Sequence, residues 1–185
     1  GDAEYAAVVD PAIPRATDLA GRLGPSEAFI EYIVGDSATV ALVVTDEGAR
    51  GLILGIGRQT LADLVTFARG AIERSPDGTA TDVWVTPMRR LYRELVAPIV
   101  SQGWLQGRTR LVIAPHAELH YLPFQAMVTS SSRIDFLIDE VSIAFAPSAT
   151  VWAHLQDRAE TRTGPTGVLA LAPLPAHRDL FTDLS

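Results

Sequence analysis

The chain has 185 residues, a formal net charge of −7 and 48% hydrophobic residues, which is enough for one domain with a sizeable core. The hydrophobic content excludes global disorder, and the acidic balance argues against nucleic-acid binding, which needs clustered positive charge. No apolar run reaches the ~20 residues that span a bilayer. No secretory leader is evident either, so we expect a cytoplasmic protein without a membrane segment.

Cysteine and lysine are both absent from these residues. Without cysteine, the chain itself has no disulfide, no catalytic thiolate and no cysteine-ligated zinc. Without lysine, it has no Schiff-base amine. Because the first residue is Gly1 rather than methionine, we expect a fragment or a processed form of a longer polypeptide.

The amino-terminal half divides into an arm and a group of strands. Residues 1–26 contain several Pro and Gly residues, which disfavour regular secondary structure. We therefore expect an arm or linker from a preceding region. Residues 27–106 should form a β-meander plus two helices. Short turn sequences separate three apolar runs, which predicts antiparallel pairing of Glu27–Val34, Ala38–Thr45 and Arg50–Ile56.

Two helices are expected after the meander. Apolar residues at helical spacing from Leu61 to Ile72 predict an amphipathic helix. The second helix should begin with Thr86 as N-cap and Pro87 in its first turn, and Pro98 should end its regular part. Its expected buried face consists of Met88, Leu91, Tyr92, Leu95, Val96 and Ile99.

Residues 107–185 have a β-α-β pattern. Three short apolar strands are expected, at Arg110–Ala114, Val141–Ala146 and Gly167–Leu171. A helix from Ser148 to about Arg158 should turn Val151, Trp152 and Leu155 inward. Strands joined by crossover segments favour parallel pairing with helices on the faces of the sheet. The fold class is therefore α/β: an antiparallel meander with helices, followed by strands of a mostly parallel sheet.

Gly55-Ile56-Gly57 lies between an expected strand and an expected helix, as in a dinucleotide-binding loop. The third glycine of that motif is replaced by Thr60, and the preceding strand belongs to a meander rather than a βαβ unit. An ordinary strand-to-helix turn is the better interpretation, and no cofactor is expected.

The remaining polar candidates do not form a catalytic group. His116 and His120 could ligate zinc, but flanking prolines oppose a helix that presents both, so a turn is favoured over a metal site. Ser148 is better explained as an N-cap than as a nucleophile, because no G-x-S-x-G motif is present. Asp139 and Glu140 should point to opposite sides of a strand.

The run Leu111–Pro115, followed by Leu119–Met127, resembles the strand, proline, short turn and Leu-Pro-Phe-x-Ala-Leu motif of CHAT domains. These domains are caspase- and separase-like cysteine peptidases. The segment Phe136–Thr150 is similar to the next family signature, and the helix around Leu91 and Tyr92 is similar to the preceding one. Upstream, the meander from Glu27 to Thr45 is similar to the strands that precede such domains. The resemblance covers about residues 22–175.

The resemblance implies that residues 107–185 form the first half of a caspase-like sheet. The family's catalytic His and Cys lie on later strands, after the segment matching Leu169–Pro173, so it implies no catalytic residue here. The intact protein would be a cysteine endopeptidase cleaving protein substrates, and this chain alone would be inactive. His116-Ala117 departs from the family's acidic-glycine turn. The family-motif residues are expected to be structural, with Leu122 and Phe124 as core anchors: Pro115, Leu122, Pro123, Phe124, Pro147 and Ser148.

The expected partners are a protein substrate or a regulatory protein, with a helical-repeat region in the same polypeptide. The alternative function is a non-catalytic interaction module that uses the free edge of the meander, including self-association. A third interpretation, a binder of nucleotides or other small ligands at Gly55–Thr60, has less support. Which residues contact a substrate is left open.

Overall fold

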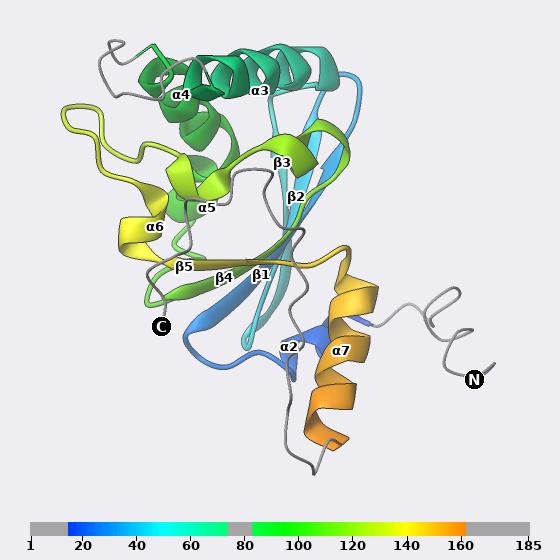
Figure 1. Cartoon of the computed structure of the whole chain (residues 1–185). Helices are drawn as coiled ribbons and strands as arrows, with labels where there is room; N and C mark the ends of the chain where they lie inside the picture. The colour runs from blue at the N-terminus through cyan, green and yellow to red at the C-terminus, as the bar shows by residue number, and fades with distance from the viewer. Residues whose placement is uncertain (1–14, 74–82, 162–185) are drawn as a thin grey trace, which may run out of the picture.

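The computed structural model describes residues 15–73 and 83–161 of the chain. These residues have an α/β fold, in which one five-stranded sheet lies between helices on both of its faces, as Figure 1 shows. The strand order is β3-β2-β1-β4-β5. In this described part of the chain, no helix combines the length and the apolar character needed to cross a membrane.

The predicted meander is confirmed. Strands β1 (Glu27–Val34), β2 (Thr39–Thr45) and β3 (Gly48–Leu54) pair antiparallel in sequence order. Alternation of side chains fixes the register, because a shift by one residue would move the buried set to the other face.

The predicted parallel strands are confirmed in the described residues. Strand β4 (Arg110–Ala114) pairs parallel with β1, and β5 (Ser142–Phe145) pairs parallel with β4. The meander and the later strands therefore share one sheet, with β1 at its centre. The third expected strand, Gly167–Leu171, lies outside the described residues.

The first face of the sheet carries the larger core. Ala28, Ile30 and Tyr32 of β1 point to this face and are buried there. The Tyr32 hydroxyl donates a hydrogen bond to the Leu95 carbonyl at 3.2 Å, and complete burial raises the pKa of this phenol far above its ordinary value. This face is covered by α3 (Arg58–Glu73), α4 (Val85–Leu95), α5 (Ala97–Ser101), the 3₁₀ helices η1 (Ala117–Tyr121) and η2 (Phe124–Ala126), and α6 (Leu137–Glu140).

The second face carries a smaller core made with α2 (Ala16–Ala20) and α7 (Ala149–Thr161). The Phe29 ring of β1 packs on Trp152, with 5.3 Å between ring centroids. An Arg22–Asp157 salt bridge of 2.9 Å joins the segment after α2 to α7. Helix α2 was not predicted, because five residues are too few for a helical period to be recognised.

Three local predictions were wrong. Helix α4 begins at Val85 with Trp84 as N-cap, so Thr86 lies inside the helix. Leu155 of α7 is exposed, because the inward face turns Ala149, Trp152 and Ala153 onto the sheet instead.

The third error concerns Asp139 and Glu140, which lie in helix α6 rather than on a strand. The Asp139 carboxylate accepts a hydrogen bond from the Phe136 backbone N–H at 3.0 Å. Because this bond caps the first turn of the helix, the local chemistry favours a helix where the apolar pattern suggested a strand.

Candidate functional site

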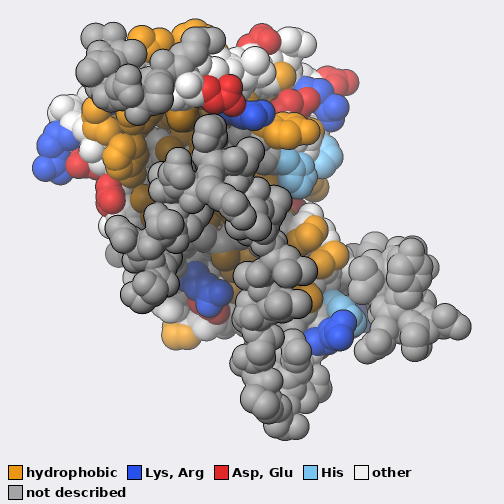
Figure 2. Space-filling model, in the orientation of Figure 1, with side chains coloured by type: hydrophobic (Ala, Val, Ile, Leu, Met, Phe, Trp, Pro, Cys, Tyr) orange, Lys and Arg blue, Asp and Glu red, His pale blue; other side chains and the backbone are white. Residues whose placement is uncertain are grey.

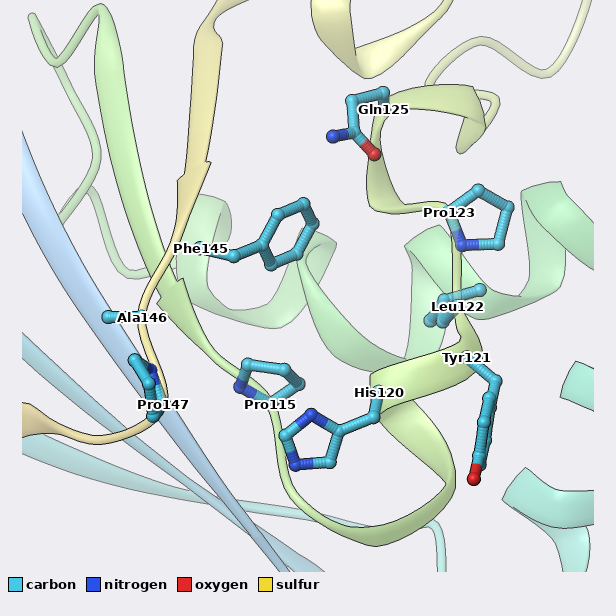
Figure 3. A pocket seen from close by; sticks show the side chains of 9 residues that line it. All are labelled: Pro115, His120, Tyr121, Leu122, Pro123, Gln125, Phe145, Ala146 and Pro147. Carbon is cyan, nitrogen blue, oxygen red and sulfur yellow. The ribbon is translucent and has the colours of Figure 1, made fainter. Parts of the chain in front are cut away.

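A pocket of about 560 Å³ lies at the carboxyl ends of strands β4 and β5. One wall is the end of β5 and the residues after it, and the other is the loop that follows β4 (Figure 3). Its lining consists of Pro115, His120, Tyr121, Leu122, Pro123, Gln125, Phe145, Ala146 and Pro147. We call this hollow the strand-end pocket.

The loop that forms one wall is anchored by buried apolar side chains. Leu122 and Phe124 are 3% and 0% exposed, so both belong to the core beneath the pocket. The Phe124 ring contacts Tyr32 and Phe145, with centroid separations of 5.8 and 6.0 Å. The contact with Phe145 joins the loop to β5, and the contact with Tyr32 joins it to β1.

The turn after Pro115 is held by a long-range hydrogen bond. The backbone N–H of Val34, at the end of β1, donates to His116 Nδ1 at 3.0 Å. The next residue, Ala117, has φ +53° and is the one non-glycine residue with positive φ among those described. That conformation costs an alanine roughly 1 kcal/mol or more. Ala117 is packed against the larger core.

The other wall leads into helix α7. Pro147 is exposed and Ser148 is half-buried. The Ser148 hydroxyl accepts a hydrogen bond from the Val151 backbone N–H at 3.2 Å, as expected of an N-cap side chain. This hydroxyl therefore serves the helix, and Ser148 does not line the pocket.

The strand-end pocket has few polar side chains. The Phe145 ring points from β5 toward the loop that bears Leu122, and Tyr121 lies on the far side of that loop, as Figure 3 shows. The polar side chains that line it belong to His120, Tyr121 and Gln125. An imidazole, a phenol and an amide can each form hydrogen bonds with a ligand.

The two histidines are not brought together as metal ligands. His116 is the N-cap of η1 and accepts a hydrogen bond, while His120 lies in the 3₁₀ helix and lines the pocket. The described residues contain no cluster of three or more metal-ligating side chains. In Figure 2, histidine side chains lie at the surface beside hydrophobic ones.

Sequence reasoning missed the side chains of Tyr121, Gln125 and Phe145 as pocket residues. Each lies next to or near a motif residue that was recognised, at the end of a strand or in the loop that follows one. The signal that could have found these residues is their position at or just after the end of a strand. The carboxyl ends of neighbouring parallel strands meet at one edge of the sheet.

A family model described as "CHAT domain" matches residues 85–181, more than half of the chain. The search of curated proteins found no match. Three solved structures are similar over much of the chain. The PilM-PilN type IV pilus biogenesis complex is 12% identical with a TM-score of 0.38, and the match covers 71% of this chain and 38% of that one.

The other two are the apo psk41 parM protein and Ta0583, an archaeal actin homolog. The first is 10% identical with a TM-score of 0.30, over 80% of this chain and 49% of that one. The second is 12% identical with a TM-score of 0.33, over 80% of this chain and 55% of that one. The chain thus spans between 38% and 55% of the length of these structures, and this likeness supports no inference about activity.

Proposed function

The chain belongs to the CHAT domain family, and we propose that it forms the scaffold and the substrate-binding surface of a caspase-like cysteine peptidase that cleaves proteins. The position of the strand-end pocket supports this proposal. The pocket lies at the carboxyl ends of two parallel strands, within the residues that the family model matches. In open α/β sheets, ligands bind at this edge.

The chemistry of such a peptidase requires a thiolate to attack the peptide carbonyl and an imidazole to transfer the proton. No cysteine occurs in the 185 residues, so the nucleophile would come from outside them. The role proposed for this chain is to hold the substrate segment against Phe145 and the Leu122–Pro123 loop.

The test compares two polypeptides, the 185-residue chain and the full product of the reading frame that contains it. We expect the chain alone to hydrolyse no fluorescently quenched casein and to gain no mass with iodoacetamide, because it lacks a thiol. The full product should hydrolyse casein and lose this activity after alkylation. The peptidase proposal would be contradicted by a full product that contains no cysteine or that does not hydrolyse protein substrates.

Substrate binding by the pocket is examined in the same full product with Phe145→Ser. Phe145 is 48% exposed on the pocket wall, and its loss should raise KM roughly tenfold with kcat little changed, the effect of removing ~1.4 kcal/mol of uniform binding. Ile138→Ser is the matched control, because Ile138 is 54% exposed and lies outside the pocket.

A second candidate function, association through the sheet edge, is favoured by a separate observation. Ile33, Val40 and Ile53 are cross-strand neighbours on the second face of β1, β2 and β3, and they are 54%, 37% and 74% exposed. They form an apolar row that ends at β3, the edge strand of the meander. An exposed edge beside apolar side chains is a template for pairing with another chain.

For this candidate we expect concentration-dependent self-association of the 185-residue chain in sedimentation velocity. Ile53→Lys should weaken the association roughly tenfold or more, because a charged side chain on an edge strand opposes pairing. Phe67→Lys is the control, since Phe67 is 50% exposed and lies on helix α3 rather than on a strand of the sheet. A wild-type chain that stays monomeric at all concentrations would contradict self-association.

A further inference from the structure

A second pocket lies near the opposite end of strand β4 from the strand-end pocket. Its volume is about 380 Å³, and it is lined by parts of α4, α5, the loop before β4, and α6. In Figure 1, α5 and α6 lie on the side of the sheet that carries the larger core. No residue of this pocket lines the strand-end pocket, so the two are separate. We call it the helix-side pocket.

The floor of the helix-side pocket is apolar. Val96, Leu111 and Leu137 are buried there, and the apolar side chains of Val100, Leu105 and Val141 also line the pocket. Pockets of ~300–1,000 Å³ with mostly apolar walls and a few polar groups are typical of sites for small ligands. The polar groups therefore decide which ligand fits.

The first of these groups is the carboxylate of Glu140, at the exposed rim. Its Oε1 accepts a hydrogen bond from the Thr129 hydroxyl at 2.7 Å, and among the described residues it forms no salt bridge. Tyr92 lines the same pocket, and its pKa is raised first by burial and then by the charge of Glu140. The rim thus carries a negative charge that no described cation compensates.

The second polar group is the guanidinium of Arg108, whose side chain is only 7% exposed. Its terminal nitrogens donate to the carboxylates of Asp46 and Glu47, at 2.6 and 3.4 Å, and to the Pro25 carbonyl. The remaining Nε–H is buried without an acceptor. A buried donor of this kind is normally matched by an oxygen.

From these observations we infer that the helix-side pocket binds an apolar α-amino carbonyl group, the chemistry shared by apolar amino acid amides and the free amino-terminal residue of a peptide. The apolar side chain of the ligand would occupy the floor. Its ammonium would pair with the Glu140 carboxylate, and its carbonyl oxygen would accept a hydrogen bond from Arg108 Nε–H. This inference goes beyond the proposed function and does not depend on it.

The experiment is an NMR titration of the ¹⁵N-labelled 185-residue chain with L-leucinamide. We expect saturable shifts of amides around Tyr92, Val100 and Glu140, and smaller or no shifts around Phe145. N-acetyl-leucinamide, which lacks the ammonium, should bind at least tenfold more weakly. Leu-Gly-Gly and its N-acetylated form distinguish the peptide source from the free amide: equal affinity of Leu-Gly-Gly and leucinamide would support an amino-terminal peptide site.

Glu140→Gln keeps the size of the side chain and removes its charge, and it should weaken leucinamide binding about tenfold. Glu94→Gln is the matched control, because Glu94 lies on α4, outside the pocket, and pairs with Arg90 and Arg93. Unchanged affinity in Glu140→Gln, equal binding of the acetylated ligand, or shifts confined to Phe145 and its neighbours would each overturn the inference. None of these readouts involves peptidase activity.

Discussion

Replacing Gly57 with alanine is expected to remove most of the stability of the fold. An alanine Cβ at this position would lie 2.9 Å from the Asp36 carbonyl carbon and 3.0 Å from that of Ser37, and closer still to the Asp36 carbonyl oxygen. All three atoms are backbone, so no side-chain rotation can relieve the clash. We expect a loss of about 3–5 kcal/mol in the free energy of unfolding, measured by urea denaturation.

The clash cannot be relieved by moving the hairpin either. The Arg58 backbone N–H donates to the Gly35 carbonyl at 2.9 Å, and the Thr39 hydroxyl donates to the Ile56 carbonyl at 2.8 Å. These bonds hold the β1–β2 turn against the segment between β3 and α3. Moving the segments apart far enough to admit the Cβ would break both bonds.

Gly55→Ala is the control for this prediction. Nothing lies within 4 Å of the position that its Cβ would take, so the free energy of unfolding should change by less than about 1 kcal/mol. Equal stability of the two variants would show that Gly57 is not needed for the close approach. A nucleotide-binding role would instead make both glycines matter for nucleotide affinity.

Much of the sheet could be predicted from the sequence because strand and helix periods are local signals. The alternation in β1 and the helical spacing in α3 depend only on residues within one element. The end of α4 before Pro98 follows for the same reason, since a proline beyond the first turn of a helix removes a hydrogen bond of that helix.

The start of α4 illustrates the limit of local reasoning. Thr86 and Pro87 suggested an N-cap and a first turn, yet the helix begins at Val85. Pro87 then occupies the third helical position, whose N–H has no intrahelical partner, so the helix loses nothing there. More than one starting residue for α4 is compatible with the same local rules. The burial of Val85 in the larger core favours the start at Val85.

The sites depended on contacts between distant segments. His116 accepts its hydrogen bond from Val34, 82 residues earlier, and the helix-side pocket joins residues from Tyr92 to Val141. The spacing of residues within one segment does not show which distant segment it contacts. The sequence analysis therefore left open which residues contact a substrate.

Phe124→Ala is the second substitution from which we expect a large effect, because this ring supports both the core and the strand-end pocket. Phe124 is fully buried and packs between Tyr32 and Phe145. Truncating a buried phenylalanine leaves a cavity and costs about 3–5 kcal/mol in the free energy of unfolding. The measurement is the urea midpoint of the 185-residue chain, with Tyr121→Ala, 64% exposed in the same loop, as a control expected to change stability by less than about 0.5 kcal/mol.

A conservative variant separates the two roles of the Phe124 ring. Phe124→Leu keeps most of the buried volume, so it should cost about 1.5 kcal/mol or less while removing the aromatic contacts to Tyr32 and Phe145. If the ring fixes the wall of the strand-end pocket, Phe124→Leu in the full product should raise KM for casein, even though the protein remains folded. An unchanged KM alongside the lower stability would mean that Phe124 acts on folding alone, and that the position of Phe145 depends on β5 rather than on the loop beneath it.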